Sequence, residues 1–508
     1  MNELNFKIGN YYLDEEQSSI VLDNSKYLLV VAGAGSGKTL TILGKIGYLI
    51  KEKSYKQDDI LCISFTKEAS LSLKNKIKKE FNLDMDVYTF HKLSLEILKE
   101  RNIYYEITST DTLINIIHEF IYIKVLSSKK HMALILKYFK MKYKNNNQYL
   151  LFLEKNKQKI KTLEKLLLSF IHLFKCNGNE LKEFLKYLKK LKRNIFTYRH
   201  NKIFLTLALN IYIEYESYLK ENNEIDFDDM IIKATKNIQE YGINKQYKII
   251  IIDEYQDTSY VRFLLIKEII NKINASLMVV GDDFQSIYRF TGCDLNLFIN
   301  FKNYFKDAKI MKIQNTYRNS QELIKVAGDF VMKNKKQIKK NLKSNKHIDK
   351  PIKLIYYDDI RKTFLKLIIE IYNKNKSKIL VLGRNNNDVY MILDTKYFKL
   401  KQDKLIYLND KNIDIRYLTI HKSKGLEEEN IIIINLENKT LGFPSQIKDE
   451  KILNLISIKE KYPYAEERRL FYVALTRTKN YAYLLVPNKN SSIFIKEIKR
   501  KCQIIRMK

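Results

Sequence analysis

The chain has 508 residues, and 91 Lys or Arg against 58 Asp or Glu give it a net charge of +33 at pH 7. This length allows several domains and a sizeable core. It contains no apolar run of the roughly 18 residues that a membrane span needs. The four cysteines lie far apart, which disfavours a disulfide framework or a metal cluster. The N-terminus lacks the basic-then-apolar pattern of a signal peptide, so we expect a cytosolic protein without membrane association.

The excess of positive charge indicates a polyanionic partner such as nucleic acid. Lysine, isoleucine and asparagine are used heavily and Trp is absent, a bias that an AT-rich genome also produces. Part of the charge therefore reflects solvated lysine faces. Because lysine is the default cation here, each arginine marks a position that favours a planar, permanently charged group.

An apolar run near the N-terminus leads into a glycine-rich turn. Residues 27–32 predict a buried strand, and Lys38 with Thr39 opens a helix. Such a loop holds phosphates with backbone N–H groups, while its lysine reaches the outer oxygens and its Thr hydroxyl binds Mg²⁺. The chain has only 14 Gly, so three within five positions favour a nucleotide site over an ordinary turn. The predicted loop consists of Ala32, which replaces the usual first glycine, and Gly33, Ala34, Gly35, Ser36, Gly37, Lys38 and Thr39.

Three further strand-like runs, besides one of four isoleucines, follow before residue 300. Residues 60–66 end in Phe65 and Thr66, and residues 86–91 end in His91. Either aromatic ring could stack on a base, but taken singly each is better explained by core packing or helix capping. In the run 277–290, Gln285 is placed to sense a γ-phosphate. Tyr288 and Phe290 on the same run offer faces for base stacking.

Four consecutive isoleucines, Ile249 to Ile252, lead directly into two carboxylates. A strand that is apolar throughout is typical of a parallel sheet buried on both faces. At its end we expect Asp253 to hold Mg²⁺ and Glu254 to orient and deprotonate an attacking water. An Asp-Glu pair alone is common. Downstream of a phosphate loop, this one indicates hydrolysis of a nucleoside triphosphate.

Residues 96–204 differ from their surroundings, because apolar spacing becomes helical and glycine nearly vanishes. Between residues 101 and 202 there are 22 basic and 7 acidic residues. This segment predicts a helical insertion whose basic side flanks a nucleic-acid strand, although a solvated helical face explains the lysines almost as well. From about residue 296 a second α/β unit is expected, with Arg318 and Arg477. Arginines that face a phosphate site in another domain neutralise transition-state charge and make hydrolysis depend on domain closure.

In this order the motifs resemble those of the UvrD/Rep/PcrA family, the superfamily 1A helicases that move 3′→5′ on single-stranded DNA using ATP. The resemblance extends from about residue 10 to 490. The motifs that carry it are Gln17, Ala32–Thr39, Ser64–Ala69, Tyr88–Leu93, Asp253–Asp257, Gly281–Phe290, Asn315–Asn319, Thr419–Glu427 and Arg468–Thr478.

The resemblance implies an α/β fold of two RecA-like P-loop NTPase domains with parallel sheets. The first domain (1A) would comprise residues 1–95 and 205–295. The basic helical insertion (1B) would be 96–204, and the second domain (2A) would be 296–508. Larger family members carry a further domain, 2B, before the motif that contains His421. Because Arg384 and His421 are only 37 positions apart, 2B is expected to be missing or reduced to a hairpin.

Carried over position by position, the family implies ATP and Mg²⁺ as cofactors. Gln17 and Tyr317 would hold the adenine, and Glu427 would contact the sugar. Lys38, Thr39 and Asp253 would serve phosphate and Mg²⁺, with Glu254 as catalytic base. The residues around the γ-phosphate would be Gln285, Arg318 and Arg477. The residues at single-stranded DNA would be Phe65, Thr66, His91, Tyr288, Phe290 and His421. Phe290 stands where the family usually has Trp, and Thr291 where it has Arg.

The resulting hypothesis is an ATP-driven 3′→5′ translocase and helicase of the bacterial cytosol, acting on single-stranded DNA and 3′-tailed duplexes. Two alternatives stay open. The chain could be the motor or DNA-sensing subunit of a nuclease–helicase complex, as in anti-phage systems of the Gabija type, with a nuclease or repair protein as partner. It could also be a P-loop signalling or binding ATPase that does not translocate, although Arg318 and Arg477 argue against that.

Overall fold

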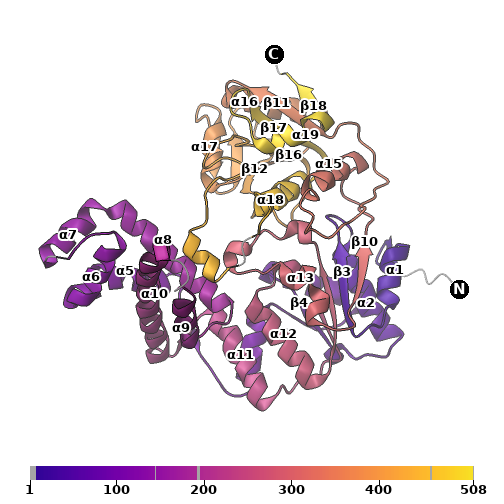
Figure 1. Cartoon of the computed structure of the whole chain (residues 1–508). Coiled ribbons are helices and arrows are strands. Elements are labelled where there is room, and N and C mark those ends of the chain that lie inside the picture. The colour runs from indigo at the N-terminus through magenta and orange to yellow at the C-terminus, as the bar shows by residue number, and fades with distance from the viewer. Residues whose placement is uncertain (1–6, 144, 192–194, 458–459, 507–508) are drawn as a thin grey trace.

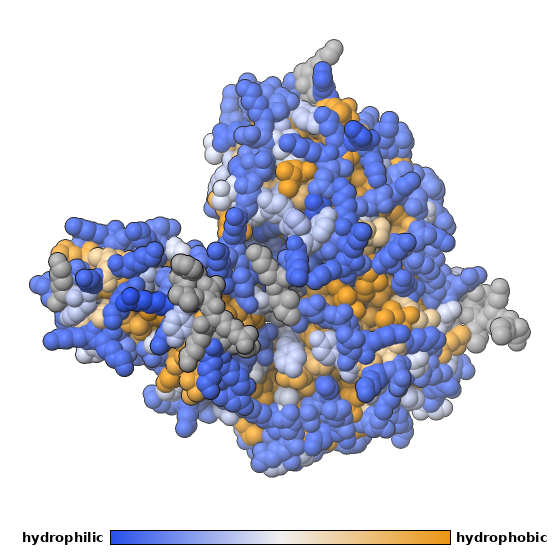
Figure 2. Space-filling view, viewed as in Figure 1, coloured by the Kyte–Doolittle hydropathy of each residue, from blue (hydrophilic) through white to orange (hydrophobic). Residues whose placement is uncertain are grey.

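The computed structural model describes residues 7–143, 145–191, 195–457 and 460–506. Two units built on sheets lie one above the other, and a helical arm projects from one side (Figure 1). We call residues 7–107 and 224–313 the first unit, 112–221 the arm and 314–506 the second unit. The viewed face is mostly hydrophilic over all three parts (Figure 2). No helix among the described residues has the length and apolar character needed to cross a membrane.

A parallel sheet of six strands forms the first unit, in the order β10-β3-β9-β8-β4-β5. The strands are β3 (Tyr27–Ala32), β4 (Ile60–Ile63), β5 (Asp86–Tyr88), β8 (Ile249–Ile252), β9 (Ser276–Gly281) and β10 (Lys309–Ile313). Because every pair is parallel, the carboxyl ends of β3, β8 and β9 reach the same edge. The loops leaving that edge carry the glycine-rich turn, the two carboxylates and Gln285.

The strands of this sheet are apolar on both faces because helices cover both. Ile249 and Ile251 of β8 point into one core, whereas Ile250 and Ile252 point into the other. This alternation explains why the strand is an unbroken apolar run. The helices of the first unit are α1 (Glu15–Leu22), α2 (Lys38–Lys51), α3 (Lys67–Phe81), α4 (Phe90–Lys99), α11 (Phe227–Tyr241), α12 (Tyr260–Ile273), α13 (Asn296–Ile299) and α14 (Phe301–Tyr304).

The second unit contains a sheet of eight strands in the order β13-β14-β15-β12-β16-β17-β11-β18. The strands are β11 (Ile352–Tyr357), β12 (Ile379–Gly383), β13 (Phe398–Lys401), β14 (Lys404–Tyr407), β15 (Ile415–Thr419), β16 (Glu428–Ile433), β17 (Thr478–Pro487) and β18 (Gln503–Ile505). Between Arg384 and His421 the chain forms the short helix α17 (Val389–Ile392), the β13–β14 hairpin and β15. The hairpin pairs antiparallel with β15, so it extends the sheet edge.

Two boundaries differ from those expected from the sequence. Residues from 296 were expected in the second unit, but β10 pairs with the edge strand β3, and Phe298 and Phe301 lie in the core of the first unit. The first unit therefore continues to residue 313. The helical insertion was expected to end at residue 204, but α10 (Ile195–Glu221) runs on as one helix. A short parallel pair, β6 (Glu106–Ile107) with β7 (Glu224–Ile225), closes the base of the arm.

The arm has its own apolar core, and a segment of the second unit takes part in it. Its helices are α5 (Thr112–Tyr122), α6 (Lys129–Tyr138), α7 (Asn146–Lys155), α8 (Lys157–Cys176), α9 (Leu181–Lys190) and α10. Ile452 and Ile456, far away in the sequence, are buried in the same core. We call residues 447–457 the strap. It crosses from the second unit to the end of α8 (Figure 1), where the Asn177 side-chain amide donates to the Ile456 carbonyl at 2.6 Å.

Replacing Ile456 by alanine is expected to lower the melting temperature and loosen the arm. Ile456 is 7 % exposed, and truncating a buried isoleucine costs about 2–5 kcal/mol of stability. The matched control is Ile447→Ala on the same strap, because Ile447 is 62 % exposed and its truncation costs at most about 0.5 kcal/mol. Thermal unfolding and hydrogen exchange of α8 measure the difference. Equal melting temperatures for the two variants would contradict the anchoring role of the strap.

Candidate nucleotide and nucleic-acid site

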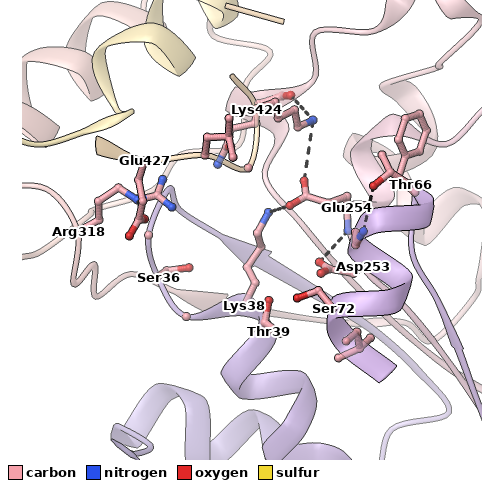
Figure 3. Close-up of a pocket in the computed structure, with 18 of the residues that line it drawn as sticks. Ser36, Lys38, Thr39, Thr66, Ser72, Asp253, Glu254, Arg318, Lys424 and Glu427 are labelled. Carbon is pink, nitrogen blue, oxygen red and sulfur yellow. Dashed lines mark hydrogen bonds and ion pairs between the residues drawn. The ribbon is translucent and has the colours of Figure 1, made fainter. Parts of the chain in front are cut away.

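A cleft of about 960 Å³ lies between the two units, at the carboxyl edge of the first sheet. Residues from the glycine-rich loop and from the ends of β4 and β8 line one side, and Arg318, Lys424 and Glu427 line the other (Figure 3). The two sides come from the two different units. Side chains that are far apart in sequence therefore converge on one space.

The loop between β3 and α2 takes a backbone shape that requires glycine. Gly35 and Gly37 have φ of 71° and 79°, in the left-handed region. A Cβ at Gly35 would stand 2.5 Å from the Arg318 Cβ, and one at Gly37 would stand 2.6 Å from the Gln17 amide nitrogen. These glycines thus let other parts of the chain approach the loop closely. Thr316 fixes it from the far side, because its hydroxyl donates to the Ala34 carbonyl at 2.7 Å.

The two predicted carboxylates follow β8 and lie beside the loop. Lys38 Nζ is 2.5 Å from Glu254 Oε1, and the Gln256 amide donates to Glu254 Oε2 at 2.5 Å. Glu254 has φ of 54°, a strained value for a residue with a side chain, and such strain often occurs at functional sites. The Asp253 carboxylate accepts from the backbone N–H of Glu254 at 2.8 Å.

The pKa values of the two carboxyl groups move in opposite directions. Burial and the neighbouring Glu254 raise the pKa of Asp253 to about 6. Burial acts on Glu254 in the same sense, but Lys38 and Lys424 outweigh it and lower the pKa of Glu254 to about 2. Glu254 is therefore ionised at neutral pH, as a general base must be. Asp253 is a half-buried carboxyl group without a basic side chain bonded to it among the described residues, which suits a metal cation.

These residues fit a nucleotide and Mg²⁺. The Ser36 hydroxyl is buried in the loop and has no hydrogen-bond partner among the described residues. The loop, the N-terminus of α2 and Lys38 together provide the donors that a phosphate chain needs. Thr39 and Asp253 would hold Mg²⁺, as predicted from the sequence. Both line the same cleft as Lys38.

Gln285 and the two arginines meet at the boundary between the units. The Arg477 guanidinium is buried and donates to Gln285 Oε1 at 3.1 Å and to the Leu426 carbonyl at 3.2 Å. Burial and the nearby Arg318 lower the pKa of Arg477 to about 9. Arg318 forms an ion pair with Glu427. The structure thus brings together Gln285, Arg318, Arg477 and Glu427, which the sequence had assigned to the γ-phosphate and sugar.

Gln17 and Tyr317 both form hydrogen bonds with Asp14 next to the loop. Gln17 is fully buried; its amide nitrogen donates to the Ser36 carbonyl at 3.1 Å, and its oxygen accepts from the Asp14 N–H at 3.1 Å. Gln17 therefore stabilises the conformation of the loop through its hydrogen bond to Ser36. Tyr317 is 61 % exposed, and its hydroxyl donates to the Asp14 carboxylate at 2.6 Å. Their adenine-binding role remains a prediction.

Four of the predicted DNA contacts form a row of rings between the units. The rings of Phe65 and Tyr288 are stacked 5.8 Å apart, and those of Phe290 and His421 are 5.6 Å apart. The Tyr288 hydroxyl donates to the His421 carbonyl at 3.0 Å, which joins the row across the cleft. Phe290 is 57 % exposed. We call Phe65, Tyr288, Phe290 and His421 the aromatic row.

The other two predicted DNA contacts lie off this row. His91 packs against Phe227, with ring centroids 4.9 Å apart. Burial and Arg262 lower the pKa of His91 to about 4, so it is neutral at neutral pH. Thr66 caps α3, where its hydroxyl accepts from the Ala69 N–H at 3.1 Å. For His91 and Thr66 the structure shows packing and capping, and a DNA contact stays a prediction.

Comparison with known proteins identifies the family. The profile described as UvrD/REP helicase N-terminal domain matches residues 13–306, and that of the UvrD-like helicase C-terminal domain matches residues 395–489. The first match alone covers more than half of the chain. The chain belongs to the UvrD/Rep helicase family. The predicted fold class, two RecA-like P-loop NTPase domains, is confirmed with it.

Individual members of the family show the same relationship. DNA helicase IV of Escherichia coli is 29 % identical over 505 residues, which is 96 % of this chain and 70 % of that protein. The ATP-dependent DNA helicase Rep of Buchnera aphidicola from Acyrthosiphon pisum is 30 % identical, over 73 % of this chain and 54 % of that protein. A probable DNA helicase of Mycoplasma pneumoniae is 25 % identical, over 93 % of this chain and 83 % of that protein. The matched share of these relatives thus ranges from about half to four fifths.

Behind the glycine-rich loop of this helicase-family chain lies a buried ionic cluster that no sequence pattern indicates. Lys340 Nζ is fully buried, forms an ion pair with Asp282 and lies 2.6 Å from Asp283 Oδ1. It also stands 3.6 Å from the centre of the Phe284 ring and 3.4 Å from the Ala32 carbonyl. Lys340 belongs to a run rich in lysine, 333–343, in which nothing in the pattern distinguishes it.

The segment Asp282–Phe290 is also fastened to the second unit. Phe284 and Ile287 lie in the apolar core of that unit, although they leave the first sheet after β9. Arg469 donates to the Ser286 carbonyl at 2.6 Å, and Arg289 lies 3.1 Å from the Glu466 carboxylate. One short segment therefore belongs to the first sheet at its start and to the second core in its middle. We call residues 282–290 the coupling segment.

Replacing Lys340 by methionine is expected to destabilise the protein and to impair ATP hydrolysis. It leaves two buried carboxylates without their cation, and breaking such a pair costs about 3–5 kcal/mol. Lys339→Met is the matched control because Lys339 is exposed. Thermal unfolding measures the first effect, and kcat for ATP of the folded fraction measures the second. A Lys340→Met protein as stable and active as Lys339→Met would refute the importance of the cluster.

Proposed function

We propose that the protein is an ATP-dependent DNA helicase that translocates 3′→5′ along single-stranded DNA and separates duplexes with a 3′ tail. The observation that carries this proposal is the coupling segment. At one point it places Gln285 against Arg477, and a few residues later it places Tyr288 and Phe290 on the aromatic row. A single short segment thus contacts both the nucleotide cleft and the surface proposed for DNA.

The chemistry proposed for the cleft follows from its own residues. ATP supplies the phosphoanhydride bond and Mg²⁺ neutralises charge on the phosphates, held by the loop, Lys38, Thr39 and Asp253. In the structure Lys38 is paired with Glu254. When Lys38 binds phosphate oxygens, it releases the Glu254 carboxylate to accept a proton from water. Glu254 retains Gln256 as a hydrogen-bond donor that fixes its orientation.

The arginines of the second unit make hydrolysis depend on closure. Arg477 is buried and already oriented by carbonyls of its own unit. Its guanidinium can stabilise charge on the γ-phosphate only while the two units are in contact. Arg318 is bonded to Glu427 within the second unit and lies beside the loop at Gly35. ATP binding therefore favours contact between the two units, because the phosphates on the first unit attract the arginines of the second. Product release removes that attraction.

Movement of the coupling segment would transmit this change to DNA. Bases would stack on the exposed part of the aromatic row, where Phe290 is accessible to solvent, and stacking on such rings tolerates any base sequence. Lys424 links the two functions from the second unit, since its ammonium donates to the Gln285 carbonyl at 2.8 Å and pairs with Asp257. The 3′→5′ direction rests on the resemblance to UvrD, Rep and PcrA.

Glu254→Gln is expected to reduce kcat for ATP by about a hundredfold or more, because a general base contributes factors of about 10²–10⁴. The variant keeps the loop and Lys38, so nucleotide binding should persist. Turnover and binding of a fluorescent ATP analogue, each with and without single-stranded DNA, measure the two properties. Robust turnover in Glu254→Gln would refute the assignment of the base.

Strand displacement on paired substrates tests the proposed function directly. The wild-type chain is given ATP with a 3′-tailed duplex, a 5′-tailed duplex and a blunt duplex of the same sequence. We expect unwinding of the 3′-tailed substrate, with single-stranded DNA stimulating ATP hydrolysis. Preference for the 5′ tail would overturn the direction. DNA-stimulated hydrolysis and translocation without unwinding would instead favour a motor subunit that needs a partner.

A further inference from the structure

Three side chains of metal-ligand type meet where the arm joins the first unit, away from the nucleotide cleft. His172 and Cys176 lie one turn apart on α8, and Asp228 lies on α11. His172 Nδ1 is 3.2 Å from Asp228 Oδ2, and Cys176 Sγ is 3.3 Å from the same oxygen. The sulfur is 3.8 Å from His172 Nδ1. One imidazole, one thiol and one carboxylate therefore face a common point.

The spacing of these atoms matches the edges of a tetrahedral site. Zinc binds sulfur at about 2.3 Å and nitrogen or oxygen at about 2.0–2.2 Å, which places neighbouring ligand atoms about 3.3–3.6 Å apart. With one ligand atom from each residue (Nδ1, Sγ and Oδ2), the separations are 3.2 to 3.8 Å and differ from that range by at most about two tenths of an ångström. The residues can thus approach a common ion without moving α8 or α11.

Unlike the two acidic residues beside it, Asp228 has no lysine or arginine ion-pair partner among the described residues. Its neighbours Asp226 and Asp229 are both paired with Lys175, at 2.7 and 2.8 Å. The ion-pair partner of Asp228 among the described residues is His172, which is charged only when protonated. The Asp228 side chain is only 13 % exposed. A buried carboxylate with so little compensation favours a bound cation.

We propose that His172, Cys176 and Asp228 bind one divalent transition-metal ion of the zinc class, with water as the fourth ligand. Sulfur and imidazole ligands select zinc over Mg²⁺ or Ca²⁺, which prefer oxygen. The His172 side chain is 43 % exposed and provides the route of entry. On binding, the Cys176 thiol loses its proton to solvent and the sulfur takes the metal in its place.

The ion would fix the arm next to the coupling segment. Its ligands come from α8 of the arm and α11 of the first unit, so it would add a link between them next to the ion pairs of Lys175. The Cys176 sulfur also lies 3.6 Å from the carbonyl of Thr291, directly after Phe290. The site is therefore structural. It would hold the end of α8 against the segment that carries the exposed ring of the aromatic row.

Cobalt is the probe for this site because Co²⁺ reports both its geometry and its thiolate ligand. The full-length chain is treated with a chelator, kept free of nucleotide, and titrated with Co²⁺ and then Zn²⁺. We expect one equivalent of Co²⁺ with tetrahedral d–d bands and a thiolate charge-transfer band, both removed by Zn²⁺. Zinc should also raise the melting temperature. Absence of the thiolate band would overturn the proposal, even if Co²⁺ binds elsewhere.

Variants identify the ligands. Cys176→Ser should abolish the charge-transfer band, while Cys502→Ser, a buried cysteine of the second unit, should leave it unchanged. His172→Gln should weaken Co²⁺ binding about tenfold or more, and it alters a partly exposed side chain, so it tests the site even if Cys176→Ser fails to fold. A band that persists unchanged in Cys176→Ser or His172→Gln would refute the assigned ligands.

Discussion

The buried cluster of Lys340 with Asp282 and Asp283 is the constraint on which the arrangement of the two units depends. A buried lysine and two buried carboxylates are tolerable only when the charges are paired and the oxygens accept further hydrogen bonds, as Asp282 does from Gln285 and Asp283 from Gln337. The carboxylates follow β9 of the first unit, and the lysine belongs to the chain of the second. The units must therefore meet at this point, directly behind the glycine-rich loop, where Lys340 also reaches the Ala32 carbonyl.

The ionic cluster fixes the start of the coupling segment. It thereby sets the positions of the residues that follow in that segment. Phe284 is held between Lys340 and the second core, so Gln285 is presented to Arg477 and Tyr288 to the aromatic row. A change in how the units meet must then move both contacts together. This arrangement couples a nucleotide to a base-stacking surface through packing, without requiring any flexible linker between them.

The parts of the fold that were predictable from sequence are those where one local pattern has one physical cause. The four isoleucines of β8 are buried on both faces, and glycines stand where the loop turns left-handed. Long-range contacts carry no such signal. The edge strand β10 has mostly exposed residues, Lys340 stands among other lysines, and the strap buries only two isoleucines. The spacing of cysteines could not indicate the His172–Cys176–Asp228 group either, since only one of its ligands is a cysteine.

The attachment of the arm to both units limits how the cleft between them can open. The arm is joined to the first unit by the β6–β7 pair, by the continuous helix α10 and by the buried ion pairs of Lys175. It contacts the second unit through the strap, where two buried isoleucines and one hydrogen bond contribute on the order of 4–7 kcal/mol. Opening therefore moves the second unit against the first unit and arm together, and the strap resists it. In a chain whose span between Arg384 and His421 forms only a short helix, a hairpin and a strand, the strap connects the second unit to the arm.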